Sequence, residues 1–118
     1  MAGILHTISR SQLFGGLPDE HLREIRNVSV EKRVNKGEIV FFDGEEGNGF
    51  YLVVEGVIRV YKMSLEGKEQ VLHIVKAGET IGAVPVFSGK SFPANAQAMT
   101  ESLLLFFPKE KFIRLITG

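Results

Sequence analysis

The chain has 118 residues and no cysteine, which excludes a disulfide framework and any metal site or iron–sulfur cluster held by thiolates. It has no excess of charge, because fourteen basic residues balance fourteen acidic ones. A domain that binds nucleic acid normally presents a basic face, so the balance argues against nucleic-acid binding by this chain. No apolar run approaches the roughly 20 residues that cross a bilayer, and the first residues lack the pattern of a secretory signal. These absences predict a single cytoplasmic domain with no membrane partner and no DNA contact of its own.

Residues that carry catalytic chemistry are also scarce. His6, His21 and His73 are the only histidines, and they lie far apart in the sequence. The chain has no H-x-x-x-H, no G-x-S-x-G and no G-x-x-x-x-G-K-S/T phosphate loop. A metal enzyme built on β-strands needs several histidines and a carboxylate from neighbouring strands, which one strand histidine cannot supply. We therefore predict that the chain is not an enzyme and has no metal site built from side chains alone.

What the chain does have is a series of short segments rich in β-branched and aromatic residues. Turn sequences such as NKGE, LEGK and KAGE separate them at nearly even spacing, which predicts a sandwich or barrel. A glycine falls at the edge of each segment, and such an ordered series is typical of a β-roll with sharp corners. The predicted strands are residues 28–34, 37–42, 49–54, 56–62, 69–75 and 95–107, and the glycines are Gly37, Gly44, Gly49, Gly56, Gly67, Gly78 and Gly82.

Helix is predicted only at the two ends of the chain. Pro18 and Pro108 each open an amphipathic segment, and acidic residues follow within the first turn, where the helix dipole favours them. We therefore expect one domain over residues 1–118. Its parts are a helical lead at 11–27, a β-roll at 28–107 and the start of the C-terminal helices at 108–118.

His73 is the one histidine within a predicted strand, EQVLHIV. The alternation places it on one face with Val71 and Val75, and it places Leu72 and Ile74 on the other. Because both faces are apolar, we expect His73 to be at least partly buried. Two interpretations stay open: a buried histidine with a hydrogen-bond partner, or a histidine inside the roll that touches a ligand or binds a haem iron.

Four motifs follow one another in the order of a known family. They are LFGGLPDEHLREI, VNKGEIVFFDGEEGNGFYLVVEGVIRVYK, EGKEQVLHIVKAGETIG and, after a run of small residues, LLLFFPKEKFIRLI. From about Ser11 onward this run resembles the N-terminal sensor domain, of the cyclic-nucleotide-binding kind, of the Crp/Fnr bacterial transcription regulators. The resemblance implies a mainly β fold, a double-stranded β-helix or jelly-roll-like β-roll with short flanking helices.

The same resemblance has consequences for partners. In such regulators a dimerisation helix and a DNA-binding helix-turn-helix follow the sensor domain, and neither is present in this chain. The resemblance therefore implies that the full-length protein is a homodimer and that DNA is bound only through the missing C-terminal domain. The present chain is expected to respond to a small-molecule effector.

The family binds cyclic AMP through a cassette that follows G-E-x-x-G. A glutamate there accepts from the ribose, and the arginine of an R-[S/T]-A motif neutralises the cyclic phosphate. The resemblance puts Ala83 at the glutamate position and Phe92-Pro93-Ala94 at the arginine motif, so both charged side chains are missing. Proline cannot donate a backbone hydrogen bond to an anion, and Lys90, the only charge nearby, lies in an SGKS turn and lacks the fork of arginine. We predict that cyclic nucleotides do not bind in the usual way.

The remaining segment is apolar and predicts a pocket for a hydrophobic or flat effector. FPANAQA followed by LLLFFP resembles in particular the branch of the family that senses nitric oxide or nitrosative stress, where haem is the proposed cofactor. We therefore predict haem or another apolar effector. Two alternatives stay open: a true cyclic AMP or cyclic GMP receptor, and an interaction module without a ligand. The predicted pocket residues are Gly82, Ala83, Val84, Phe92, Pro93 and Ala94, with His73 as the polar contact, and Val86, Phe87, Ala96 and Met99 are expected to line or cover the pocket.

Overall fold

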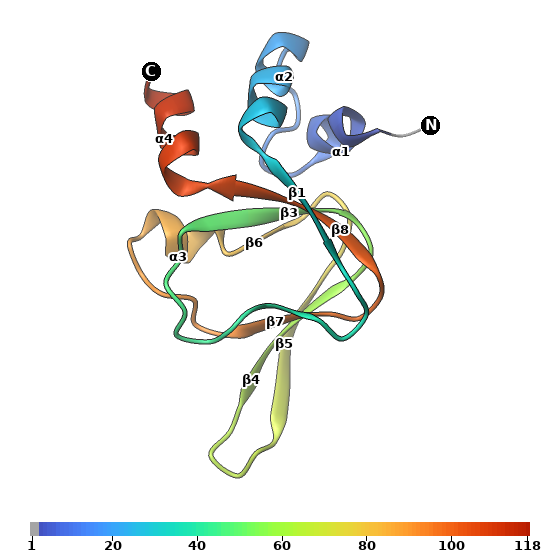
Figure 1. The fold of residues 1–118 in the computed structure, drawn as a ribbon, viewed down its shortest axis with the longest axis vertical. Helices are drawn as coiled ribbons and strands as arrows, with labels where there is room; N and C mark the ends of the chain where they lie inside the picture. The colour runs from blue at the N-terminus through green and yellow to red at the C-terminus, as the bar shows by residue number, and fades with distance from the viewer. Residues whose placement is uncertain (1–2) are drawn as a thin grey trace.

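The computed structural model describes residues 3–118, which form two four-stranded antiparallel sheets and four short helices (Figure 1). The helices are α1 (Ile4–Arg10), α2 (Asp19–Val28), α3 (Ala83–Phe87) and α4 (Lys109–Thr117). The strands are β1 (Val30–Val34), β2 (Ile39–Phe41), β3 (Gly49–Glu55), β4 (Ile58–Met63), β5 (Glu69–Val75), β6 (Thr80–Ile81), β7 (Asn95–Ala98) and β8 (Ser102–Pro108). No helix in this described part of the chain has the length and apolar character needed to cross a bilayer.

The strand order is β1-β8-β3-β6 in the first sheet and β2-β7-β4-β5 in the second. Apart from the β4–β5 hairpin, neighbouring strands are not consecutive in the sequence, as expected when one chain winds around two facing sheets. α1, α2 and α4 gather over the outer face of the first sheet, and α3 lies at one end of the roll (Figure 1). The predicted fold class, a mainly β roll with short flanking helices, is confirmed.

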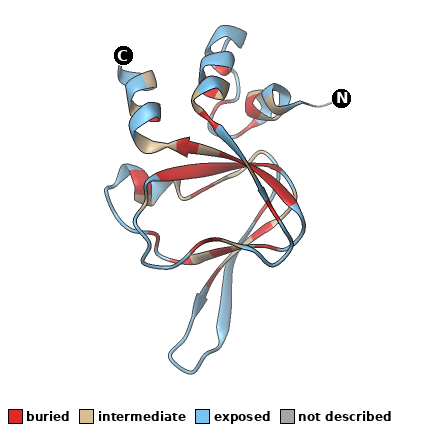
Figure 2. Cartoon of the chain, viewed as in Figure 1, coloured by how far each residue is buried: buried red, intermediate tan, exposed pale blue. Residues whose placement is uncertain are grey.

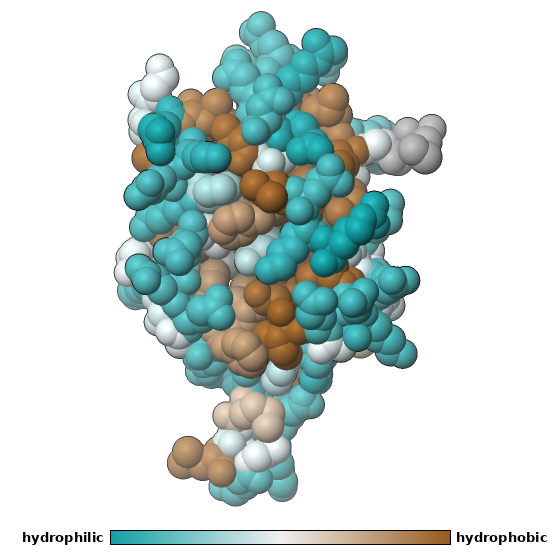
Figure 3. Space-filling view, viewed as in Figure 1, coloured by the Kyte–Doolittle hydropathy of each residue, from teal (hydrophilic) through white to brown (hydrophobic). Residues whose placement is uncertain are grey.

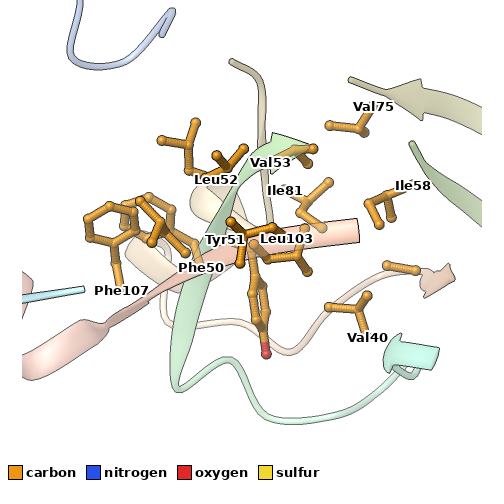
Figure 4. Packing of buried hydrophobic residues seen from close by; sticks show 14 of the residues in the cluster. Val40, Phe50, Tyr51, Leu52, Val53, Ile58, Val75, Ile81, Leu103 and Phe107 are labelled. Atoms are coloured by element: carbon orange, nitrogen blue, oxygen red, sulfur yellow. The ribbon is translucent and has the colours of Figure 1, made fainter. Parts of the chain in front are cut away.

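β3 and β8 form the centre of the core (Figure 2). Phe50 and Phe107 are fully buried and stack with their ring centroids 5.0 Å apart, on the face that the helices cover. Tyr51 points the opposite way, into the space between the sheets (Figure 4). Its burial, together with the nearby Glu45 carboxylate, raises the pKa of the Tyr51 phenol. Burial of each large apolar side chain contributes roughly 1.5–3 kcal/mol, so this pair of strands is the stable base for the rest of the fold.

Residues 95–107, which we predicted as one strand, form two strands in different sheets. β7 pairs with β2 and β4, whereas β8 pairs with β1 and β3. The chain crosses between the sheets at residues 99–101, where the Val57 N–H donates to Thr100 Oγ1 over 3.2 Å. These three residues include neither glycine nor proline, so the composition carries no signal for the turn.

Two helices lie outside the ends where helix was predicted. α1 begins at Ile4, ahead of the expected lead, and its Ile8 is fully buried. α3 has the sequence AVPVF, which is poor in helix-forming residues. Its Val86 is fully buried, so tertiary packing decides the conformation of this short segment rather than intrinsic propensity.

The β4–β5 hairpin extends away from the body of the roll (Figure 1). Val60 pairs with His73 and Tyr61 pairs with Val71, so Leu72 is an extra residue in a β-bulge. Paired residues share a face, and the bulge therefore puts Val71 and His73 on opposite faces. The uninterrupted alternation predicted for residues 69–75 is wrong at this point.

Arg59 holds the base of this hairpin to the neighbouring strand. Its Nε donates to Gln97 Oε1 over 2.8 Å and its Nη2 to Glu69 Oε2 over 2.7 Å, and the guanidinium lies 4.1 Å from the centroid of the Tyr61 ring. The hydrogen bond with Arg59 lowers the pKa of Glu69, and the same contact raises the pKa of Arg59. The contacts are exposed on the Glu69 side, so they orient the hairpin more than they stabilise the fold.

Candidate functional site

A cavity of about 410 Å³ lies between α3, the loop that precedes β7 and the end of β5. One wall is apolar and comes from α3 and the loop, through Ala83, Val84, Pro85, Phe92, Pro93 and Ala94. The lining also includes a polar rim made of Gln12, His73, Glu79 and Thr80. Apolar side chains from four strands complete the lining, namely Phe41, Val60, Val75 and Ile81. The cavity can therefore hold a flat molecule that has an apolar body and one polar edge.

Gly82 and Phe92 shape the apolar wall. Gly82 has a φ of 83°, a left-handed conformation that turns the chain sharply from β6 into α3. A Cβ atom at Gly82 would lie 2.7 Å from Phe92 Cε1, so only glycine allows this approach. The Phe92 ring in turn stacks on Phe41, with centroids 3.8 Å apart and planes 12° apart. An aromatic ring thus lies where the sequence resemblance implies the arginine of the cassette.

The charge of the cavity comes from one acidic residue. Glu79 is a carboxylate at the rim, and its Oε1 accepts a hydrogen bond from the Lys76 N–H over 2.7 Å. Among residues 3–118, no lysine or arginine lines the cavity. Lys90, the one cation considered from the sequence, is exposed. Its backbone N–H donates a hydrogen bond to the Pro85 carbonyl. A buried anion would therefore meet a carboxylate and no neutralising partner.

All seven predicted pocket residues line this one cavity. The expectation that His73 is partly buried is wrong, because β5 is the outer strand of its sheet and the imidazole lies in solvent at the rim. Several expected neighbours do not line the cavity. Val86 and Ala96 are fully buried in the core, Phe87 packs against rings on the far side of α3, and Met99 is 42% exposed outside the cavity.

Sequence reasoning missed the polar rim apart from His73. Gln12 follows α1, and its N–H donates to the Gly78 carbonyl over 3.3 Å, which brings this early turn to the cavity. Glu79 ends the turn between β5 and β6, and Thr80 begins the short strand β6. The one available signal was the KAGE turn, which places an acidic residue immediately before the cassette.

An aromatic cluster connects α3 to the C-terminal helix. The Phe87 ring lies 5.5 Å from Phe50 and 5.7 Å from Phe112 of α4, centroid to centroid. Phe112 also contacts Phe14 and Phe107, at 5.8 Å and 5.9 Å. A change in the position of α3 therefore acts directly on the packing of α4.

Residues 31–118 match the family described as cyclic nucleotide-binding domain. The chain belongs to this family. It is 28% identical over 106 residues to the cyclic AMP receptor protein of Thermus thermophilus, across 90% of this chain and 49% of that protein. It is 30% identical over 95 residues to the fumarate and nitrate reduction regulatory protein of Escherichia coli, across 80% of this chain and 38% of that protein.

A solved structure agrees with these relatives. The sensor domain of the transcriptional regulator DNR from Pseudomonas aeruginosa is similar at a TM-score of 0.82 and 26% identity, across 95% of this chain and 75% of that one. The chain spans about half of the Thermus relative's length and less of the Escherichia one. The cyclic nucleotide-binding domain is thus of the kind found in Crp/Fnr-like regulators, as the sequence motifs predict.

Proposed function

We propose that this cyclic nucleotide-binding domain is the effector sensor of a cytoplasmic Crp/Fnr-type transcription regulator and that its effector is an apolar small molecule, not a cyclic nucleotide. The observation that carries the proposal is the cavity at the cassette position. Its lining has an aromatic ring and two prolines where the resemblance implies an arginine motif and backbone donors, and none of the lysines or arginines among residues 3–118 lines it.

The energetic argument against a cyclic nucleotide is direct. Burial of a phosphate without a paired cation costs several kcal/mol, against roughly 8 kcal/mol of total binding free energy for a micromolar ligand. Pro85 and Pro93 have no N–H to offer in compensation. The cost therefore removes most of the affinity that the base and ribose can supply.

Haem is our specific candidate for the effector. His73 lines the cavity with an exposed imidazole, and the apolar wall suits the face of a macrocycle. When bound, haem would supply an iron that takes small gases such as nitric oxide. In this proposal His73 holds the group at the rim, while Phe92 and the residues of α3 exclude water from one side of it.

A haemin titration followed by absorbance tests this candidate. We expect a sharp Soret band that saturates at about one haem per chain and that His73→Ala abolishes, because the His73 imidazole is the side chain that would hold the iron. His21→Ala is the matched control, since the His21 side chain is 54% exposed on α2 and far from the cavity. A band that persists in His73→Ala removes His73 from the proposal.

The proposed signal runs from the cavity to α4. A ligand that repacks α3 changes the contact of Phe87 with Phe112, and the resulting shift between two packings of α4 is a population shift. In the whole regulator α4 would lead toward the dimerisation and DNA-binding parts. Those parts lie outside this chain, so the present domain contributes ligand recognition and not DNA contact.

An interaction module is the second candidate, and the β4–β5 hairpin favours it. Hydrophobic side chains are visible at the hairpin tip (Figure 3), where Leu65 is fully exposed. Met63, Val71, Leu72 and Ile74 are each at least 41% exposed on the same hairpin. An apolar surface of this kind is typical of a protein contact. A domain that binds no small molecule but loses a protein partner on Leu65→Ser would support this candidate.

A further inference from the structure

We propose that Gln12, a residue outside the cassette, contacts the effector directly: its side-chain amide donates a hydrogen bond to an oxygen atom on the polar edge of the ligand. This inference rests on the proposed function, because it concerns the same cavity. It adds a specificity-determining residue, and it narrows the effector to flat apolar molecules that carry a carbonyl or carboxylate oxygen at one edge.

Gln12 reaches the cavity from the N-terminal part of the chain. It lies in the turn between α1 and α2, and among residues 3–118 it is the one lining residue that precedes the β-strands. Its N–H donates to the Gly78 carbonyl over 3.3 Å, and the Gly78 N–H donates to the Val53 carbonyl of β3 over 2.9 Å. Two hydrogen bonds in series therefore tie this early residue to the central strand of the first sheet.

The backbone around Gln12 is held in place before any ligand binds. The preceding residue, Ser11, is buried, and its Oγ donates to the Ile8 carbonyl over 2.7 Å and accepts from the Phe14 N–H over 3.1 Å. Phe14 is also buried, and its ring centroid lies 5.5 Å from that of Phe107 in the core. A ligand that bonds to Gln12 therefore loses little free energy in ordering the backbone, which favours affinity.

The chemistry of the rim indicates which group Gln12 recognises. Glu79 is a carboxylate, which only accepts hydrogen bonds, whereas a glutamine amide has two N–H donors. Gln12 is exposed, and its side chain makes no hydrogen bond within residues 3–118, so the amide is available to a ligand. An acceptor oxygen at the edge of the ligand therefore pairs with Gln12.

Haem, our candidate effector, carries such oxygens on its two propionate groups, which project from one edge of the macrocycle. Because Gln12 is exposed, a propionate bound there stays in contact with water and avoids the cost of burying an unpaired anion. Gln12 would thus hold the edge of the same group whose iron His73 would hold.

Two iron porphyrins test this contact. Haemin carries the propionates, and etiohaemin has the same iron macrocycle with alkyl groups in their place. Gln12→Leu keeps the backbone hydrogen bond and removes the amide, so we expect the affinity for haemin to fall about fivefold and that for etiohaemin to change less than about twofold, both measured at the Soret band. A role of Gln12 in the fold alone would weaken both equally and would contradict the inference.

Gln12→Glu is the sharper variant, because it keeps the shape of the side chain and replaces its donors with a carboxylate. We expect the affinity for haemin to fall at least about tenfold and that for etiohaemin to change less than about twofold. Gln70→Glu is the matched control. Gln70 is exposed on β5 and does not line the cavity, so the same change of charge should leave both affinities within about twofold of the wild type.

The outcomes separate this inference from the proposed function. If haemin binds in the cavity but neither Gln12 variant changes its affinity relative to etiohaemin, the contact by Gln12 is wrong while the haem sensor stands. Ala83→Phe, which fills the apolar wall, shows whether a porphyrin lies in the cavity. If neither porphyrin binds in a saturable way that Ala83→Phe removes, the haem proposal falls, and the inference on Gln12 falls with it.

Discussion

Replacing Gly56 with alanine should destabilise the domain by about 3–4 kcal/mol, a large part of the stability of a domain of this size. Gly56 has a φ of 98°, which costs an L-residue roughly 1–2 kcal/mol. A Cβ there would also overlap the Ser102 side chain and lie 2.8 Å from the Glu101 carbonyl oxygen, at the crossing between the two sheets. Urea unfolding followed by circular dichroism measures the change.

Gly67→Ala is the matched control for this prediction. Gly67 also has a positive φ, 81°, but nothing lies within 4 Å of a Cβ at this hairpin tip. We expect only the conformational cost there, about 1 kcal/mol. If both variants lose the same free energy of unfolding, the steric overlap between a Cβ at Gly56 and Ser102 does not contribute, and the prediction is wrong.

Phe112→Ala should remove about 3–5 kcal/mol of stability and release α4 from the body of the domain. The ring is 5% exposed and meets Phe50 edge-to-face at 5.2 Å, in addition to Phe14, Phe87 and Phe107. Hydrogen exchange in residues 109–117 should rise more than exchange in β3 and β8, because the helix loses its main contact while the sheet keeps its own core.

Ile116→Ala on the same helix serves as the control. Its side chain is 61% exposed, so truncation should cost less than about 0.5 kcal/mol and leave the exchange of α4 near the wild-type level. If Phe112→Ala behaves like Ile116→Ala, the aromatic cluster does not hold α4, and the proposed path from the cavity to this helix is wrong.

Most of the fold could be predicted from the sequence because its local signals are strong. Turn residues bound the strands, and six of the seven corner glycines have a positive φ: Gly37, Gly44, Gly56, Gly67, Gly78 and Gly82. Gly49 differs, since its φ is not positive and it is needed for space: a Cβ atom there would lie 2.5 Å from the backbone oxygen of Phe107. The turn at residues 99–101 could not be predicted because it is set by pairing with distant strands. The bulge at Leu72 could not be predicted because it depends on the register of the β4–β5 hairpin, which the alternation along one strand does not show.

The sequence predicted the cavity residues that belong to the cassette itself. Apart from His73, it did not predict the residues that other parts of the chain contribute to the same cavity. Residues 82–84 and 92–94 are joined by the rest of α3 and the short loop after it, and they form one wall. Gln12 reaches the same cavity through a hydrogen bond to Gly78 in the turn after β5, a contact that the sequence does not indicate. For Glu79 the only signal was its place in the KAGE turn before the cassette. The exposure of His73 follows from the position of β5 at the edge of its sheet, and strand order is a property of the whole fold.

Isothermal titration calorimetry with cyclic AMP and cyclic GMP tests the central claim most directly. In the described residues 3–118 no lysine or arginine lines the cavity, and Phe92 stacks on Phe41 where we propose that the cassette arginine is missing, so we expect no saturable heat even at millimolar nucleotide. A saturable isotherm with micromolar affinity, lost on Ala83→Phe, would show that this cavity holds a cyclic phosphate after all and would contradict the account.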